Sequence, residues 1–168
     1  MEQMRTILQL QDIINEKAVL KKSNELGAKA KDLKVLQESI HKLEEEYQAI
    51  EKSILAKEEK LKSLEQLAEK LAQQAQGSKD RLYSAKGSSL KELLSLQQAI
   101  QRIEQDIQNS EAEYWDTTKE IEQLKEQRKN LREMAKSLKN QYNQGVKEYK
   151  AEKINIQLKM AEITIREE

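Results

Sequence analysis

The stretch "LKVLQESIHKLEEEYQAIEKSILAKEEKLKSLEQLAEKLAQQA", residues 33–75, decides the fold of this 168-residue chain. Alternating steps of three and four residues from Leu33 to Ala75 visit thirteen positions, of which twelve are apolar. Lys57 is the exception. Because hydrophobic residues make up 37% of the chain, chance would place only about five there. This heptad pattern predicts a long helix that packs one stripe against a second helix.

The second half of the chain carries the same pattern. Steps from Leu93 to Tyr142 again meet mostly apolar residues, after which the pattern weakens and shifts toward Ile156, Met160 and Ile163. At the start of the chain, Ile7, Leu10 and Ile14 have heptad spacing but are out of phase with the stripe that starts at Leu33. Leu26 is the first residue in phase with that stripe. These phase changes predict a local change of supercoil or looser packing.

Together the two halves predict an all-α fold, a long antiparallel two-helix coiled-coil hairpin. The expected parts are a first helix over 1–76, a tip loop over 77–89 and a second helix over 90–168. The nearly equal helices would place residue i opposite about residue 165 minus i. The weak segments 15–30 and 135–150 would then face each other.

The local chemistry of the break fits a turn between helices. Gly77 is suited to the position after a helix end, where a left-handed backbone is common. Ser89 and Glu92 have the spacing of a capping box at the start of the second helix. The intervening loop is long for a helical turn and basic, and long loops on rigid scaffolds often carry recognition.

The segment "RLYSAKGSSLKELLSLQQAI", residues 81–100, resembles the tip of bacterial proteins that have a coiled-coil hairpin followed by a C4-type zinc ribbon. Their usual tip reads R-L-Y-S-G-K-V-x-N-P-K-E-L-x-x-L-Q. The residues that match it in register are Arg81, Leu82, Tyr83, Ser84, Lys86, Lys91, Glu92, Leu93, Leu96 and Gln97. The opening "LQLQDIINE", residues 8–16, is also similar to the family's start. Ala85, Gly87 and Leu90 depart from the pattern.

The resemblance implies a bacterial cytoplasmic regulator, since some members are linked to the alternative sigma factor RpoN, to flagellar or type III secretion assembly, and to RNA. It therefore predicts a non-catalytic scaffold or adaptor that binds a protein partner through its tip. The tip residues expected to contact that partner are Arg81, Tyr83, Ser84, Lys86 and Lys91. The zinc ribbon is absent from these 168 residues, so no cofactor is expected here, and zinc only if a ribbon follows.

A second class of function stays open, because basic residues gather in two segments. Residues 17–34 hold six Lys against two acids, and residues 128–153 hold eight Lys or Arg against three. The predicted hairpin would bring these segments together as a basic zone able to bind nucleic acid, RNA in particular. The candidate residues are Lys21, Lys22, Lys29, Arg128, Lys129, Arg132, Lys136 and Lys139. A purely mechanical spacer is the third alternative.

The composition argues against catalysis. His41 is the only histidine, cysteine is absent, and no glycine-rich phosphate loop occurs, so the chain is not expected to be an enzyme. We expect no metal site, no signal peptide and no membrane-spanning segment. The resulting expectation is a cytoplasmic protein that is a monomer or a weak homodimer.

Overall fold

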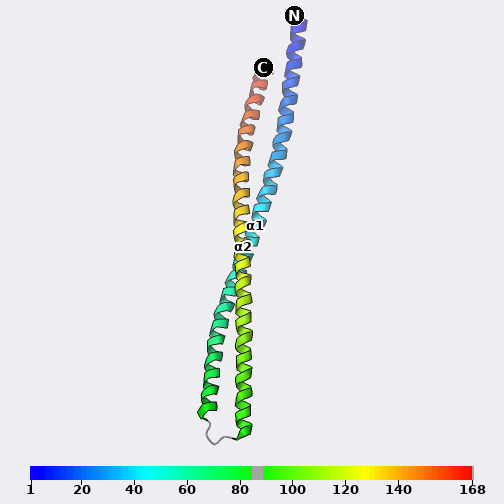
Figure 1. The fold of residues 1–168 in the computed structure, drawn as a ribbon. Coiled ribbons are helices and arrows are strands. Elements are labelled where there is room, and N and C mark those ends of the chain that lie inside the picture. Colours follow the sequence, from blue (N-terminus) through cyan, green and yellow to red (C-terminus); the bar gives the residue numbers. More distant parts are fainter. Residues whose placement is uncertain (85–88, 168) are drawn as a thin grey trace. The chain divides into compact units, whose positions relative to one another are not determined.

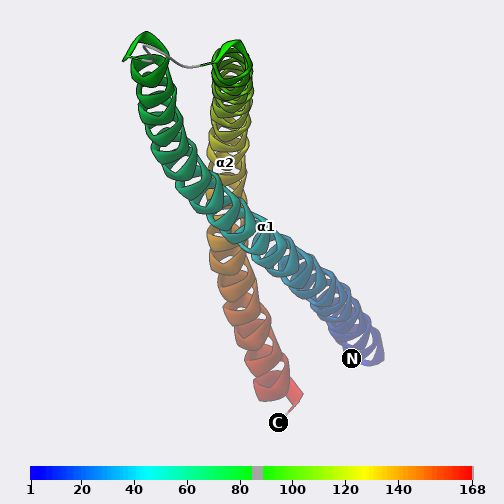
Figure 2. The ribbon, with the colours of Figure 1, turned by 90° about the horizontal axis from the view of Figure 1, so that it is seen from below.

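The computed structural model describes residues 1–84 and 89–167, which form two helices and, within those ranges, no strand. Helix α1 is Glu2–Ser84, with 83 residues, and helix α2 is Leu90–Glu167, with 78 residues. Their contacts divide the chain into unit 1, Met1–Glu46 with Leu131–Glu168, and unit 2, Tyr47–Asn130. In each unit one segment of α1 lies antiparallel beside one segment of α2 (Figure 1, Figure 2). The fold is an all-α helical hairpin, as predicted.

The heptad pattern is confirmed by burial in unit 2. Among the described residues of this unit, every buried one occupies a predicted stripe position, and these residues are Ile54, Leu64, Leu71, Ala75, Ile100, Ser110, Thr117 and Ile121. Leu, Ile and Ala at this spacing form one apolar face on each helix, and the two faces cover each other. The apolar core of unit 2 therefore follows from the sequence.

Unit 1 buries fewer residues than unit 2, and its heptad stripe keeps one phase along each helix. Val19 and Ile156 are its buried residues, and half-buried Leu26 and Lys29 continue the same alternating spacing along α1. The separate phase predicted from Ile7 is wrong, because Ile7, Leu10 and Ile14 are exposed. Several stripe positions in this segment hold polar residues, so the apolar pattern of the sequence does not indicate the true phase of the stripe. Lys29 is one of them, and it stays in the stripe by pairing with Glu152 across the helices.

The predicted end of the first helix is also wrong, because α1 continues through Gly77 to Ser84. The tip loop therefore does not begin at residue 77, whereas the predicted start of the second helix at residue 90 agrees with α2. Contacts with α2 explain the continuation. Lys79 pairs with Glu104 at 3.4 Å, and half-buried Leu82 is on the packed side of α1. Lys79 and Leu82 make these contacts only because the helix continues past Gly77.

Replacing Gly77 with alanine tests this continuation. A Cβ at Gly77 would meet no atom within 4 Å, so Gly77→Ala is expected to raise the free energy of unfolding by about 1 kcal/mol. Urea denaturation followed by circular dichroism would measure the change. If residue 77 instead ended the helix in a left-handed conformation, alanine would be strained there and the variant would be less stable.

The later helix end changes which residues face each other. In unit 1 a Cβ built on Gly145 would lie 2.6 Å from Cδ2 of Leu33. In unit 2 the Tyr114 hydroxyl donates to Glu65 at 3.2 Å. Residue i thus faces about residue 178 minus i, and the predicted value of 165 is wrong. The predicted pairing of 15–30 with 135–150 fails with it.

Candidate functional site

The tip surface consists of Arg81, Tyr83 and Ser84 at the end of α1 and Leu90, Lys91 and Leu94 at the start of α2, all in unit 2. All six side chains are exposed. Lys86, a further predicted tip residue, lies outside the described residues, as do Ala85 and Gly87. The structure thus places four of the five predicted tip residues, Arg81, Tyr83, Ser84 and Lys91, on or beside the last turn of one helix or the first turn of the other.

Tyr83 is the least covered of the five tyrosines. Its side chain is 84% exposed, whereas the other four are half-buried. It borders a shallow groove between the helices that is also lined by Lys79, Leu82, Gln97, Ile100 and Gln101. The phenol ring is therefore not used to build the hairpin, and it lies beside a groove whose floor includes the half-buried Leu82 and the buried Ile100.

The first turn of α2 is fixed by its cap. The Glu92 backbone N–H donates to Oγ of Ser89 at 3.3 Å, and the Leu93 N–H donates to the Ser89 carbonyl at 3.1 Å. Ser89 is thus the N-cap that the sequence predicts. A fixed first turn holds Leu90 and Lys91 in defined positions. In contrast, the Ser84 hydroxyl forms a hydrogen bond within α1, donating to the Arg81 carbonyl at 3.4 Å.

Two apolar members of the tip surface were missed by the sequence reasoning. Leu90 is 74% exposed and Leu94 is 51% exposed. Both lie next to stripe positions without belonging to the stripe, which runs through Leu93 and Leu96. That offset is the signal that could have identified them, since a leucine outside the packed stripe has no partner helix to cover it.

The predicted basic zone is not brought together. Lys29 pairs with Glu152, whereas Lys139 pairs with Glu44 at 3.0 Å. Along α1, Lys29 and Glu44 are separated by about 22 Å at 1.5 Å per residue. The five predicted residues of α2, Arg128, Lys129, Arg132, Lys136 and Lys139, lie along one stretch of that helix, whereas Lys21 and Lys22 lie opposite about residues 156–157. The corrected register sets Lys139 beside the acidic run 44–46, so the eight residues do not form one basic surface.

The corrected register creates a different basic zone in unit 1. Residues 17–34, with six Lys against two acids, face about residues 144–161, with four Lys against two acids. Lys22 and Lys159 meet across the helices within this zone. The neighbouring Lys22 lowers the pKa of Lys159, because only a neutral Lys159 amine can accept a hydrogen bond from the Lys22 ammonium group and because two ammonium charges repel each other. We refer to these two segments as the unit 1 basic zone.

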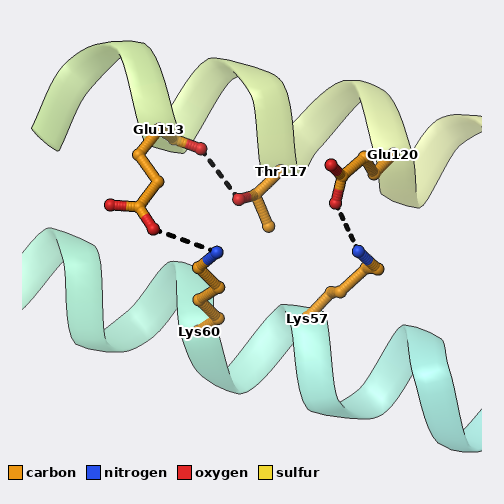
Figure 3. Close-up of polar contacts among 5 residues, drawn as sticks. All are labelled: Lys57, Lys60, Glu113, Thr117 and Glu120. Carbon is orange, nitrogen blue, oxygen red and sulfur yellow. Dashed lines mark hydrogen bonds and ion pairs between the residues drawn. The ribbon is translucent and has the colours of Figure 1, made fainter. Parts of the chain in front are cut away.

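In unit 2 ion pairs cross from one helix to the other along the edges of the apolar stripe. Lys57 pairs with Glu120, and Lys60 pairs with Glu113 at 3.0 Å (Figure 3). The hydrogen bond from Lys57 lowers the pKa of Glu120. Between these pairs lies Thr117, which is 2% exposed and donates to the Glu113 carbonyl at 2.8 Å. The pairing explains the one polar position in the stripe of residues 33–75, since Lys57 reaches sideways to a carboxylate.

The part of the chain that the structure describes, residues 1–84 and 89–167, holds no group of three or more His, Cys, Asp or Glu side chains placed to bind a metal ion. His41 is an exposed surface residue that pairs with Glu45 at 3.0 Å. Neither described helix is long and apolar enough to cross a membrane.

Comparisons with protein-family models, with curated proteins and with solved structures found no match to this chain.

Proposed function

We propose that this chain is a non-catalytic adaptor that binds a protein partner through the tip surface. The observation that carries the proposal is the 84% exposure of Tyr83. Tyrosine and arginine are frequent among the residues that dominate the binding energy of protein interfaces. Tyr83 and Arg81 lie two residues apart at the end of α1, and neither side chain is buried in the hairpin. The resemblance of residues 81–100 to the tip of a bacterial regulator family also supports the proposal.

The composition of the tip surface indicates the chemistry of the partner. Tyr83, Leu90 and Leu94 offer apolar area, and Arg81 and Lys91 place positive charge beside it. A fitting partner would present an apolar pocket with carboxylates at its rim. A bacterial cytoplasmic regulator such as the alternative sigma factor RpoN is the first protein to test, because the family resemblance implies it.

Tip variants are expected to lose partner binding. Removing a central aromatic or arginine anchor commonly costs 2 kcal/mol or more, which is about thirtyfold in affinity. Tyr83→Ala and Arg81→Ala should therefore weaken the complex with purified RpoN at least tenfold in a calorimetric titration. Trp115→Ala is the matched control, because Trp115 is an exposed aromatic residue of unit 2 outside the tip surface.

A photo-crosslinking amino acid at position 83 extends the test beyond one partner. In bacterial cells it should capture a protein that the same reagent at position 115 does not capture, and Arg81→Ala should abolish that product. Identical products from both positions, or unchanged affinity for the partner in Tyr83→Ala, would refute the proposal.

RNA binding is less well supported than protein binding. Lys29 and Lys139 are engaged with Glu152 and Glu44, and the register places Lys21 and Lys22 opposite about residues 156–157 of α2, not opposite residues 128–139. Binding through phosphate contacts would weaken steeply as salt is raised. A salt titration with RNA would therefore distinguish this alternative.

A further inference from the structure

Ion pairs between α1 and α2 recur at one edge of the heptad stripe. Three of these pairs belong to one heptad series, and they are Lys79–Glu104 at 3.4 Å, Glu58–Lys125 at 4.0 Å and Glu44–Lys139 at 3.0 Å. Their members on α1 are separated by multiples of seven residues, and so are their members on α2. Charged pairs are common at positions that flank the stripe of a coiled coil. The next members of this series are therefore also expected to face each other.

In unit 1 the series continues without ion pairs. One heptad further along, the facing residues are Gln37 and Val146. A second heptad brings Ala30 to face Lys153. Neither combination can form an ion pair, because Val146 and Ala30 are apolar. Lys153 thus faces a methyl group at the place where Lys139 faces the carboxylate of Glu44.

A groove lies where these ion pairs are missing. Its volume is about 410 Å³, and the residues that line it are Ala30, Leu33, Lys34, Gln37, Tyr142, Val146, Tyr149, Lys150 and Lys153. Leu33, Val146 and the two tyrosines are half-buried and form its floor, whereas the three lysines are exposed at its rim. Binding pockets commonly have volumes of about 300–1,000 Å³. We call this site the edge groove.

The rim of the edge groove carries positive charge that unit 1 does not balance. All three of its lysines belong to the unit 1 basic zone. Lys150 and Lys153 have no Asp or Glu three or four residues away, the spacing at which a helix forms ion pairs. Within residues 1–84 and 89–167, no carboxylate lies at ion-pair distance from Lys34, Lys150 or Lys153.

The acids of this part of α2 act on Lys29 instead. The hydrogen bond from Lys29 to Glu152, together with the charges of Glu148 and Glu25, raises the pKa of Lys29. None of these four residues is among the described residues that line the edge groove. The groove therefore presents an apolar floor and a purely basic rim to any ligand.

We propose that the edge groove binds an amphipathic helix of a protein partner, with the apolar face of that helix on the groove floor and its carboxylates paired with Lys34, Lys150 and Lys153. Amphipathic helices commonly bind apolar grooves in this way. A partner carboxylate beside Lys153 would take the role that Glu44 has beside Lys139. The partner would thus complete the ion-pair series that the chain leaves unfinished.

The floor of the groove favours a helix over a nucleic acid. Proteins that bind single-stranded nucleic acids stack the bases on open aromatic rings. Tyr142 and Tyr149 are instead half-buried beside Leu33 and Val146, so they add to an apolar floor. All residues of the edge groove lie in unit 1 and none belongs to the tip surface, so this inference does not depend on the proposed function.

Two synthetic helical peptides of equal length serve as probes. Both carry the same leucine stripe, and the positions that flank the stripe hold glutamate in one peptide and lysine in the other. Each peptide is labelled and titrated with the full chain, and binding is followed by fluorescence anisotropy. The glutamate peptide is expected to bind at least tenfold more tightly than the lysine peptide, because lysine would face lysine at the rim.

Variants of the chain locate the binding site. Lys153→Glu should weaken binding of the glutamate peptide at least tenfold, because like charges would then meet. Lys147→Glu is the matched control, since Lys147 is an exposed lysine of α2 in unit 1 that does not line the groove. Ala30→Glu removes no lysine and supplies the chain's own carboxylate to Lys153. It should weaken peptide binding at least tenfold while the variant stays as stable in urea as the wild type.

Several outcomes would overturn the proposal. They include equal affinity for the two peptides, no binding of either peptide by the wild type, and equal weakening by Lys153→Glu and Lys147→Glu. A single-stranded oligonucleotide that binds more tightly than the glutamate peptide, and that Lys153→Glu releases, would assign the groove to a nucleic acid instead. A doubling of the 19.6 kDa mass that Lys153→Glu abolishes would assign it to a second copy of the chain.

Discussion

Truncating Ile54 to alanine is expected to lower the free energy of unfolding by about 2–5 kcal/mol. Ile54 is 3% exposed and lies at a stripe position of unit 2. Its side chain packs between α1 and α2, so its removal leaves a cavity that the surrounding side chains can close only in part. Because alanine is itself a better helix former than isoleucine, the loss must come from packing between the helices.

The neighbouring Leu55 provides the control for this prediction. It is 61% exposed, one residue away from the stripe, and Leu55→Ala should change stability by less than about 0.5 kcal/mol. Urea denaturation followed by circular dichroism would compare the two variants. Equal effects at residues 54 and 55 would mean that the predicted stripe does not hold the helices together.

Replacing Gly145 with alanine is expected to give no gain in stability, although alanine normally favours a helix over glycine by about 1 kcal/mol. The new Cβ would lie 2.6 Å from the Leu33 side chain, which would have to shift. At Gly27 the same change meets no atom within 4 Å, so Gly27→Ala should give the full gain. Gly27 and Gly145 both lie within unit 1, one on each helix.

A double-mutant cycle tests whether the Leu33 side chain is the reason that Gly145→Ala gives no gain in stability. In a Leu33→Ala background the obstruction is gone, and Gly145→Ala should then stabilise by about 1 kcal/mol, a coupling within the usual range for residues in contact. The cycle is measured by thermal or urea denaturation of the four proteins. Additive effects of the two changes would show that Leu33 and Gly145 do not face each other.

The sequence predicts the hairpin and the buried stripe of unit 2 because both depend on a periodicity that the residues display directly. Ile54, Leu64 and Ile121 are buried at the positions that the pattern indicates. The Ser89 cap is predictable for the same reason, since capping depends on residues close together in the chain.

The end of α1 could not be predicted from local residues. Gly77 resembles a helix terminator by itself, and the contacts that extend the helix, such as that between Lys79 and Glu104, come from distant parts of the chain. Because α1 was predicted to end too early, the predicted pairing of residues between α1 and α2 was also wrong. The wrong register then predicted a basic zone made of residues that do not face each other.

The candidate tip surface was predictable in part. Arg81, Tyr83 and Lys91 were identified from the motif, and the structure places all three in solvent. Leu90 and Leu94 do not belong to the family motif, so the motif does not indicate them. Their positions beside the stripe of α2, which runs through Leu93 and Leu96, are the sequence feature that predicts their exposure.

Disulfide trapping tests the central claim, the register of the hairpin, most directly. These 168 residues contain no cysteine, so an introduced pair is the only pair within them. Leu33→Cys with Gly145→Cys is expected to form a disulfide within one chain, whereas Leu33→Cys with Arg132→Cys is not, because a disulfide requires Cα atoms within about 7 Å. A bond in the 33–132 pair, or bonds only between chains, would contradict the hairpin described here.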